Sequence, residues 1–244
     1  MSLNYTQYVT TLSTLTAISP TNADFQAILP SVIDYSEQRI YRELDLITED
    51  VRDSSASTTA LNRNFTLPTT IGTFQIISGI NIITPASTSA NSGTRNPCTP
   101  VSQAVLDLTW PSTTGAGIPT EYCYLSQSLV PGQTNIIFGP WPSDTYTVEV
   151  VGKIIPAPLS STNPTTFLSL YLPDLFLMAS AEYMTGPYMK NFGATSDNPQ
   201  SAMTFEQQYQ LLLKSASDWE ARKRFSGGSW TSARLEPTAQ PQRG

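Results

Sequence analysis

The sequence has 244 residues, of which 39% are hydrophobic and only 13% are charged, and its net charge at pH 7 is −6. The acidic balance argues against a basic surface for nucleic acid, and the charged fraction is about half of that usual in soluble proteins. Histidine is absent, which removes the commonest zinc ligand and general base and argues against most hydrolases and metalloenzymes.

Helical periodicity marks the first fifty residues of the chain. Apolar residues within Leu3–Ala17 fall largely on one helical face, which predicts a first helix. A stronger pattern, with apolar spacings of three and four, predicts a second helix over Asn22–Leu44. Pro30 lies inside this second helix, so we expect the helix to kink there or to restart at Ser31.

The pattern changes after the acidic end of the second helix. Ser54–Thr59 has the composition of a linker, and only seven residues within Ala60–Ser161 are charged. Six short β-prone runs, separated by turns rich in glycine and proline, predict an antiparallel β-sandwich or a small barrel. The runs are Phe65–Leu67, Thr73–Ile83, Val101–Trp110, Tyr122–Leu125, Thr134–Phe138 and Thr145–Ile155.

Helical signals return after a second linker, Pro156–Thr165. Pro173 and Asp174 are typical of a helix start, and the helix that they begin is expected to stop near Gly186. A last helix is predicted over Asn198–Phe225. The residues beyond it contain glycine, proline and few apolar side chains, which indicates a flexible tail that orders on a partner.

These signals together predict an α+β fold. Helices from the two ends of the chain would pack into one bundle, and the β-rich segment would be an insertion joined to the bundle by the two linkers. The predicted domains are 1–58 and 165–225 for the two parts of the helical bundle, 59–164 for the inserted β-rich domain and 226–244 for the C-terminal docking tail.

No constellation of residues indicates catalysis, a cofactor or a metal. The acidic residues within Glu43–Asp53 could suggest a divalent-cation site, but they lack calcium-loop spacing, and a solvated helix end explains them better. Cys98 and Cys123 lie outside any dense cysteine framework, so we expect unpaired thiols. Signal-peptide features and long apolar runs are missing, which leads us to expect a soluble protein made in the cytosol.

Two sets of residues are candidates for protein contacts. Trp230 in the predicted tail either anchors the chain in a partner's pocket, with Arg234 and Leu235 beside it, or folds back on the helices. Residues 200–244 hold six Lys or Arg against four acids, whereas residues 1–59 hold three against eight, so opposite ends of identical subunits could attract one another. The inter-subunit candidates are Arg222, Lys223, Arg224, Glu43 and Asp45.

Four stretches of the sequence, taken together and in this order, resemble the head-to-tail adaptor (connector) proteins of tailed bacteriophages. They are DYSEQRIYRELDL at Asp34–Leu46, GPWPSDTYTVEVVGKIIPAPLS at Gly139–Ser160, YLPDLFLMASAEYM at Tyr171–Met184 and MTFEQQYQLLLKSASDWEARKR at Met203–Arg224. The resemblance implies a structural protein that forms a homo-oligomeric ring, typically dodecameric, in the neck of the virion after assembly in the host cytoplasm. Packaged DNA would pass through this ring without sequence-specific binding.

The same resemblance implies the partners of the ring. The C-terminal extension, with Trp230, Arg234 and Leu235, would dock on the portal protein, and tail, nozzle or fibre proteins would bind the other side. No membrane and no cofactor is implied.

Two other functions stay open. The chain could be another neck, tail or fibre-attachment protein of the virion, in which the β-rich domain is the main interface. It could also be a carbohydrate-binding or hydrolytic β-domain on a helical stalk, with Trp110 and Trp141 as the residues to test. A structural protein is favoured over an enzyme.

Overall fold

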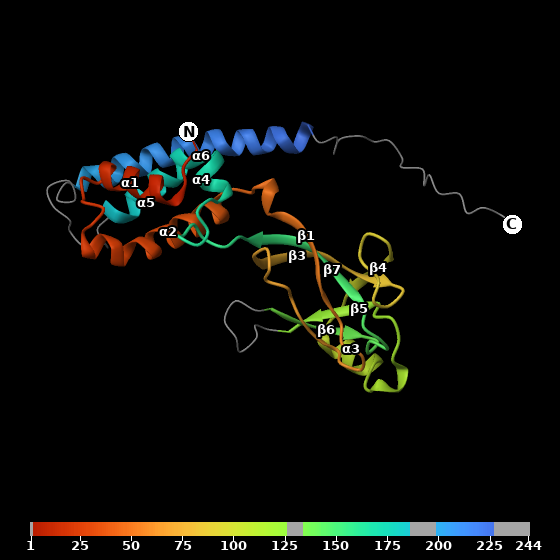
Figure 1. Ribbon diagram of the computed structural model, residues 1–244. Helices are drawn as coiled ribbons and strands as arrows, with labels where there is room; N and C mark the ends of the chain where they lie inside the picture. The colour runs from red at the N-terminus through yellow and green to blue at the C-terminus, as the bar shows by residue number, and fades with distance from the viewer. Residues whose placement is uncertain (1, 126–133, 186–198, 227–244) are drawn as a thin grey trace.

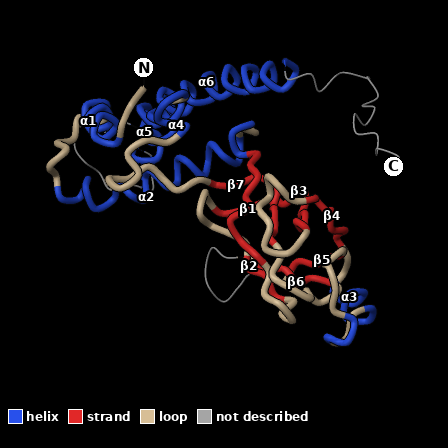
Figure 2. Tube along the Cα trace, turned by 45° about the vertical axis from the view of Figure 1, so that its right-hand side comes forward, coloured by secondary structure: helices blue, strands red, loops and turns tan. Residues whose placement is uncertain are grey.

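The computed structural model describes residues 2–125, 134–185 and 199–226 and shows an α+β fold (Figure 1). Helices from the two ends of the chain lie together, and a curled sheet lies beyond one end of them (Figures 1 and 2). We call the group of helices the helical part, and the sheet with its one α-helix the β part. The predicted α+β class is confirmed.

The first helix, α1, spans Tyr5–Leu15 and begins with a capping box. The Asn4 side chain accepts the backbone N–H of Gln7 at 2.9 Å, and the Gln7 side chain accepts the backbone N–H of Asn4 at 3.0 Å. These two bonds satisfy N–H groups that the first turn of a helix leaves without partners.

The second helix, α2, spans Ala23–Glu43, and the side chain of Asn22 caps it. It continues through Pro30, so the helix does not restart at Ser31, which was one of the two outcomes expected there. The other outcome, a kink at Pro30, stays a prediction. Burial of one apolar face outweighs the single hydrogen bond that proline cannot donate. That face comprises Phe25, Leu29, Val32, Ile33 and Ile40.

Three helices follow the sheet, namely α4 over Phe167–Tyr171, α5 over Pro173–Thr185 and α6 over Pro199–Ser226. The start of α5 and the bounds of α6 agree with the predictions. The short helix α4 was not predicted, although its capping box of Thr166 and Ser169 is a local sequence signal.

Both ends of the chain contribute to one hydrophobic core in the helical part. The ring of Tyr8 on α1 stacks on that of Phe176 on α5, with the ring centroids 4.6 Å apart. The Tyr8 hydroxyl bonds to Ser180 of α5, whose own hydroxyl lies 3.1 Å from that of Ser36 on α2. Tyr209 of α6 is fully buried in the same core. The description of these helices as a bundle stays a prediction.

The β part is one curled, seven-stranded sheet with the strand order β1-β7-β3-β4-β5-β6-β2. Neighbouring strands run antiparallel except β4 and β5, which run parallel, so the prediction of a wholly antiparallel unit is wrong. The predicted sandwich or small barrel is not confirmed. The strands are β1 Asp50–Ser57, β2 Asn64–Thr66, β3 Thr73–Thr84, β4 Thr94–Pro100, β5 Glu121–Tyr124, β6 Asn135–Gly139 and β7 Thr147–Ile155.

Two segments of the β part differ from the predicted elements. Val101–Trp110 was predicted as a strand, but Gln103–Thr109 forms the helix α3. The side chain of Ser102 caps this helix, and Leu106 buries its apolar face beneath Trp110. The strand β4 was not predicted, because it contains two prolines and proline is rare inside sheets.

The linker predicted at Ser54–Thr59 is wrong, because most of it belongs to β1. This strand pairs with β7 from Asp50 opposite Lys153 to Ser57 opposite Thr147. The chain therefore enters the sheet almost directly after α2. The predicted domain boundaries themselves stay predictions.

Gly152 of β7 lies where β3 bulges against it. A β-carbon at this position would stand 2.1 Å from the carbonyl oxygen of Ile76, whereas one at Gly79 of β3 would meet no atom within 4 Å. We predict that Gly152→Ala lowers the free energy of unfolding by about 1–3 kcal/mol, because the two strands must move apart. Gly79→Ala is the matched control and should change stability little. Urea unfolding followed by circular dichroism compares the two variants, and equal stabilities would contradict the close approach.

Candidate functional site

The candidate site is described from residues 2–125, 134–185 and 199–226. No group of three or more Cys, Asp or Glu side chains there could hold a metal ion. Cys98 and Cys123 are free and buried, as we predicted, and burial raises the pKa of Cys98 to about 12. None of the helices in these ranges is long and apolar enough to cross a bilayer. The junction between the two parts and the surface of the helices are described next.

The first connection between the two parts is Leu44–Glu49. Leu44 and Leu46 are buried in the core of the helical part. Residues Ile47–Glu49 form a single 3₁₀ turn, η1, which contacts both β7 and α6. The backbone N–H of Ile47 donates to the carboxylate of Glu220 on α6 at 3.3 Å, so the end of α6 holds this connection.

Four charged side chains surround this connection and form what we call the ionic cluster, namely Asp45, Asp50, Lys153 and Arg224. Arg224 of α6 lies 2.7 Å from the carboxylate of Asp45 and 4.0 Å from that of Asp50. Lys153 of β7 pairs with Asp45 and lies 3.5 Å from Asp50. Its hydrogen bond is the main reason why the pKa of Asp45 lies below the ordinary value. The two cations thus come from the two parts of the protein, and so do the two acids, because Asp50 begins β1 and Asp45 lies between the buried Leu44 and Leu46 of the helical part.

Glu49 is buried beside the ionic cluster and is only 6% exposed. Among the described residues, its Oε1 atom has no hydrogen-bond partner. Burial raises the pKa of Glu49 to about 7; Lys153 and Arg224 oppose the rise, and Asp45 and Asp50 add to it. A carboxyl group in this position holds its proton up to neutral pH.

The second connection leads from β7 to α4 and is held by another buried carboxyl group. Leu159 is buried with the helical core, and its backbone N–H donates to Glu37 of α2 at 3.1 Å. Glu37 is only 3% exposed, and burial raises its pKa to about 7. Both connections are therefore tied to the helical part by acidic side chains from α2 and α6.

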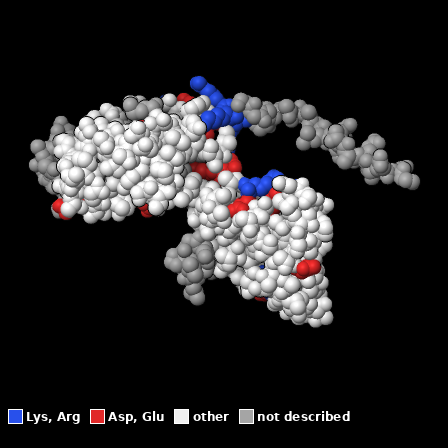
Figure 3. Space-filling model, in the orientation of Figure 1, with Lys and Arg blue, Asp and Glu red and all other residues white. Residues whose placement is uncertain are grey.

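Charged side chains are distributed unevenly over the surface. Figure 3 shows Lys and Arg at the end of α6 and on the adjoining edge of the β part, with Asp and Glu between them. The face of the helical part seen in this view is almost free of charge.

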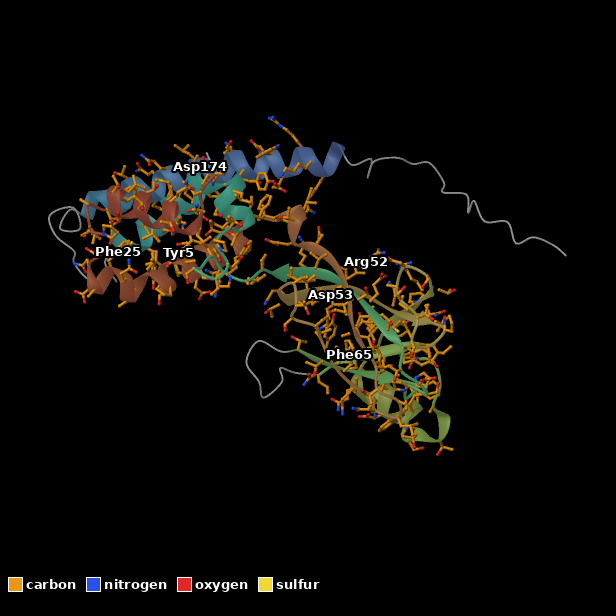
Figure 4. All side chains as sticks on the ribbon, in the orientation of Figure 1. Tyr5, Phe25, Arg52, Asp53, Phe65 and Asp174 are labelled. Carbon is orange, nitrogen blue, oxygen red and sulfur yellow. The ribbon has the colours of Figure 1, made fainter. Side chains whose placement is uncertain are left out.

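The charges on the β part belong to a second network. Glu149 of β7 is buried and accepts hydrogen bonds from Arg95 at 3.1 and 3.2 Å and from Asn81 at 2.9 Å. Arg52 of β1, labelled in Figure 4, lies 3.7 Å from the same carboxylate. These bonds hold the pKa of Glu149 below its ordinary value against the effect of burial. The network satisfies a buried charge and joins four strands, β1, β3, β4 and β7.

The structure places two of the three predicted inter-subunit residues of the C-terminal end in ion pairs within the chain. Arg224 pairs with Asp45, and Lys223 pairs with Glu220. Arg222 lies on the wall of a groove of about 370 Å³ beside the start of α5. Contacts between neighbouring subunits through these residues stay a prediction.

Glu43, another predicted inter-subunit residue, also has partners in its own chain. It accepts the Tyr209 hydroxyl at 2.8 Å and lies 3.2 Å from Arg39. Arg39 stacks over the Tyr209 ring at 4.2 Å and pairs with Glu182 at 3.2 Å and Glu206 at 2.8 Å. This side chain thus joins α2, α5 and α6. The predicted portal-docking residues lie outside the described part of the chain; they are Trp230, Arg234 and Leu235.

The outer face of α1 is a surface that the sequence analysis missed. Thr10, Thr11 and Thr14 each donate their hydroxyl to the backbone carbonyl four residues earlier, at 2.8–2.9 Å. The hydroxyls are therefore satisfied by the helix itself, and the exposed threonines present their methyl groups. No charged side chain precedes Asp24 in the sequence, which is the signal that could have revealed this face.

The described residues thus give an α+β chain in two parts, with no charged side chain on α1. A family model described as SU10 adaptor protein matches residues 3–234. The match spans nearly the whole sequence, and the chain belongs to this family. No curated protein matches the sequence.

The family match confirms the predicted resemblance to phage head-to-tail adaptors. The family is a structural one, and its members are components of the virion.

The two buried acids at the connections predict how stability depends on pH. Their pKa values rise from about 4.5 in the unfolded chain to about 7 in the folded protein. Their contribution to stability is fully present below pH 4.5 and is lost as the pH rises through 7, because the folded state binds protons more tightly. For Glu37, which is nearly fully buried, the loss is on the order of 3 kcal/mol.

We expect Glu37→Gln and Glu49→Gln to flatten this dependence, since a neutral amide replaces each group that titrates. Urea unfolding at pH 5 and pH 8 measures the difference for each variant and for the wild type. Asp218→Asn, which removes an exposed carboxylate of α6, should keep the wild-type difference. Wild-type behaviour of both glutamine variants would show that neither acid titrates in this range.

Proposed function

We propose that the protein is a head-to-tail adaptor that assembles into a ring, binds the portal protein and continues the DNA channel toward the tail. The ring is a homo-oligomer, dodecameric in this proposal, in the neck of the virion. Its other partners are tail, nozzle or fibre proteins. The protein acts through these contacts and not as an enzyme.

The uncharged face of α1 is the observation that carries this proposal. Burying a charged group in an interface costs free energy unless it finds a partner, and an unpaired hydroxyl costs some as well. Thr10 and Thr14 are exposed, yet their hydroxyls already have acceptors on α1. A neighbouring chain can therefore cover this face without breaking a hydrogen bond or desolvating a charge.

The ion pairs within the chain are a second observation that supports the same proposal. The acids and bases near the end of α6 are largely paired with each other, as Asp45 is with Arg224. They leave few strong charges to attract the wrong partner. The net charge of −6 also suits a channel through which DNA slides without being held, because phosphates are repelled weakly.

Attachment of a neck or fibre protein through the β part is the second candidate function. Leu108 of α3 is 83% exposed and Val105 is 48% exposed, at the end of the β part that lies away from the helices (Figure 2). Exposed apolar residues at such a tip favour a contact with another protein.

The carbohydrate-binding alternative finds no support in the two tryptophans that it needs. The indole N–H of Trp110 donates to Glu121 at 3.0 Å, and that of Trp141 donates to the carbonyl of Trp110 at 3.1 Å. Both side chains are partly buried and pack within the β part. They are engaged in the fold and are not free platforms for sugar stacking.

Charge on the α1 face should abolish self-assembly. We predict that Thr10→Lys combined with Thr14→Lys prevents ring formation, because each interface would then bury several like charges. Thr10→Val combined with Thr14→Val is the control, since it keeps shape and neutrality and should still assemble. Sedimentation velocity and negative-stain electron microscopy measure the rings, and circular dichroism verifies the fold of both variants. Rings of normal size from the lysine variant would exclude this face as the subunit contact.

The C-terminal segment should determine binding to the portal. Purified full-length protein mixed with portal-containing, DNA-filled capsids is expected to add a ring at the portal vertex, visible by electron microscopy. A variant truncated after Phe225 should still form oligomers but leave the vertex bare, because it lacks Trp230, Arg234 and Leu235. Equal occupancy by both proteins would remove the tail from the mechanism, and no occupancy by either would contradict the adaptor function.

A further inference from the structure

The two parts of the protein meet at a junction in which the chain between them is only a few residues long. Leu46 is fully buried with the helical core, and Val51 packs against the core of the sheet. The residues between these two anchors, 47–50, include the turn η1 and the first residue of β1. Any change in the angle between the two parts that leaves both cores intact must be absorbed in these residues and in the second connection.

The ionic cluster spans this junction. Lys153 and Asp50 lie in the sheet, whereas Arg224 lies in α6 and Asp45 lies between the buried residues Leu44 and Leu46 of the helical part. The pairs that cross the junction are therefore Lys153 with Asp45, and Arg224 with Asp50 at 4.0 Å. The side chains are 23% exposed for Lys153, 39% for Arg224, 47% for Asp50 and 60% for Asp45. Ion pairs with this degree of exposure are weak singly and are screened by salt.

A hollow beside the cluster provides room for movement. It has a volume of about 500 Å³ and is lined by Tyr41 and Leu44 from the helical side and by Ile76 and Ile155 from the sheet. Ile76 is 58% exposed, and so is not held by a core. The contact between the parts at this place therefore depends on the charged residues more than on close apolar packing.

We propose that Asp45, Asp50, Lys153 and Arg224 form an ionic clasp that fixes the orientation of the β part against the end of α6. Opening the clasp lets the β part turn about residues 47–50. The β part is held in one orientation at low ionic strength. It is released when salt screens Lys153 and Arg224 or when another anion binds them. This inference concerns the single chain and does not depend on ring formation.

Electron spin resonance distances between two labels test the clasp. Ser31 on α2 and Thr109 at the end of α3 are exposed positions, one on each part, at which cysteines can carry the labels. The buried native thiols react slowly, and the parent chain measures their background labelling. At about 0.05 M NaCl the wild type should give one narrow distance distribution, which should widen or gain a second population at about 1 M NaCl, where the screening length falls to about 3 Å.

Variants assign this response to the clasp. Arg224→Gln and Lys153→Gln should show the wide distribution already at low salt. Arg222→Gln is the matched control, because it removes the same charge from the same helix at a residue that does not belong to the cluster, and it should behave as the wild type does. Narrow distributions in Arg224→Gln and Lys153→Gln at every salt concentration, or equal widening in Arg222→Gln, would overturn the proposal.

Discussion

The stacking of Tyr8 on Phe176 joins the first helix of the chain to a helix that lies beyond the whole sheet. A chain of hydroxyls from Tyr8 through Ser180 to Ser36 adds α2 to the same contact. Once these helices share a core, the chain has to leave it and return to it at neighbouring places. The sheet is therefore carried by two short connections, and the buried carboxyl groups of Glu37 and Glu220 bind one each. Loss of the shared core would release both.

Only 13% of the residues are charged, and the positions of these residues determine which surfaces are neutral. The guanidinium of Arg39 pairs with three carboxylates, one each from α2, α5 and α6. The carboxylate of Glu149 is contacted by two arginines and an asparagine from three other strands. Several other pairs gather at the junction of the two parts (Figure 3). The outer face of α1 is neutral because no charged side chain precedes Asp24 in the sequence. A neutral face costs little to bury, which is the property that a chain needs if it is to be covered by its neighbours.

Membership of the SU10 adaptor protein family relates these features to one role, that of a structural protein of the virion. An assembly protein has to be stable as a single chain and must still bind other chains during assembly. The core of the helical part provides the first property. In the function that we propose, the neutral α1 face and the exposed apolar tip at Leu108 would provide surfaces for the second. The ionic clasp would add a third property, a β part whose orientation can respond to the surroundings.

Local patterns in the sequence were enough to predict the long helices, because caps such as Asn22 and the apolar spacing in α2 act within a few residues. They also indicated a β-rich middle and the family resemblance. They failed for Gln103–Thr109, whose single buried residue gives too short a pattern to separate helix from strand, and for β1, whose polar residues pair only because β7 lies beside them. The pairing of Asp45 with Arg224, 179 residues apart, depends on how the helices and the sheet meet, and only the tertiary structure decides it.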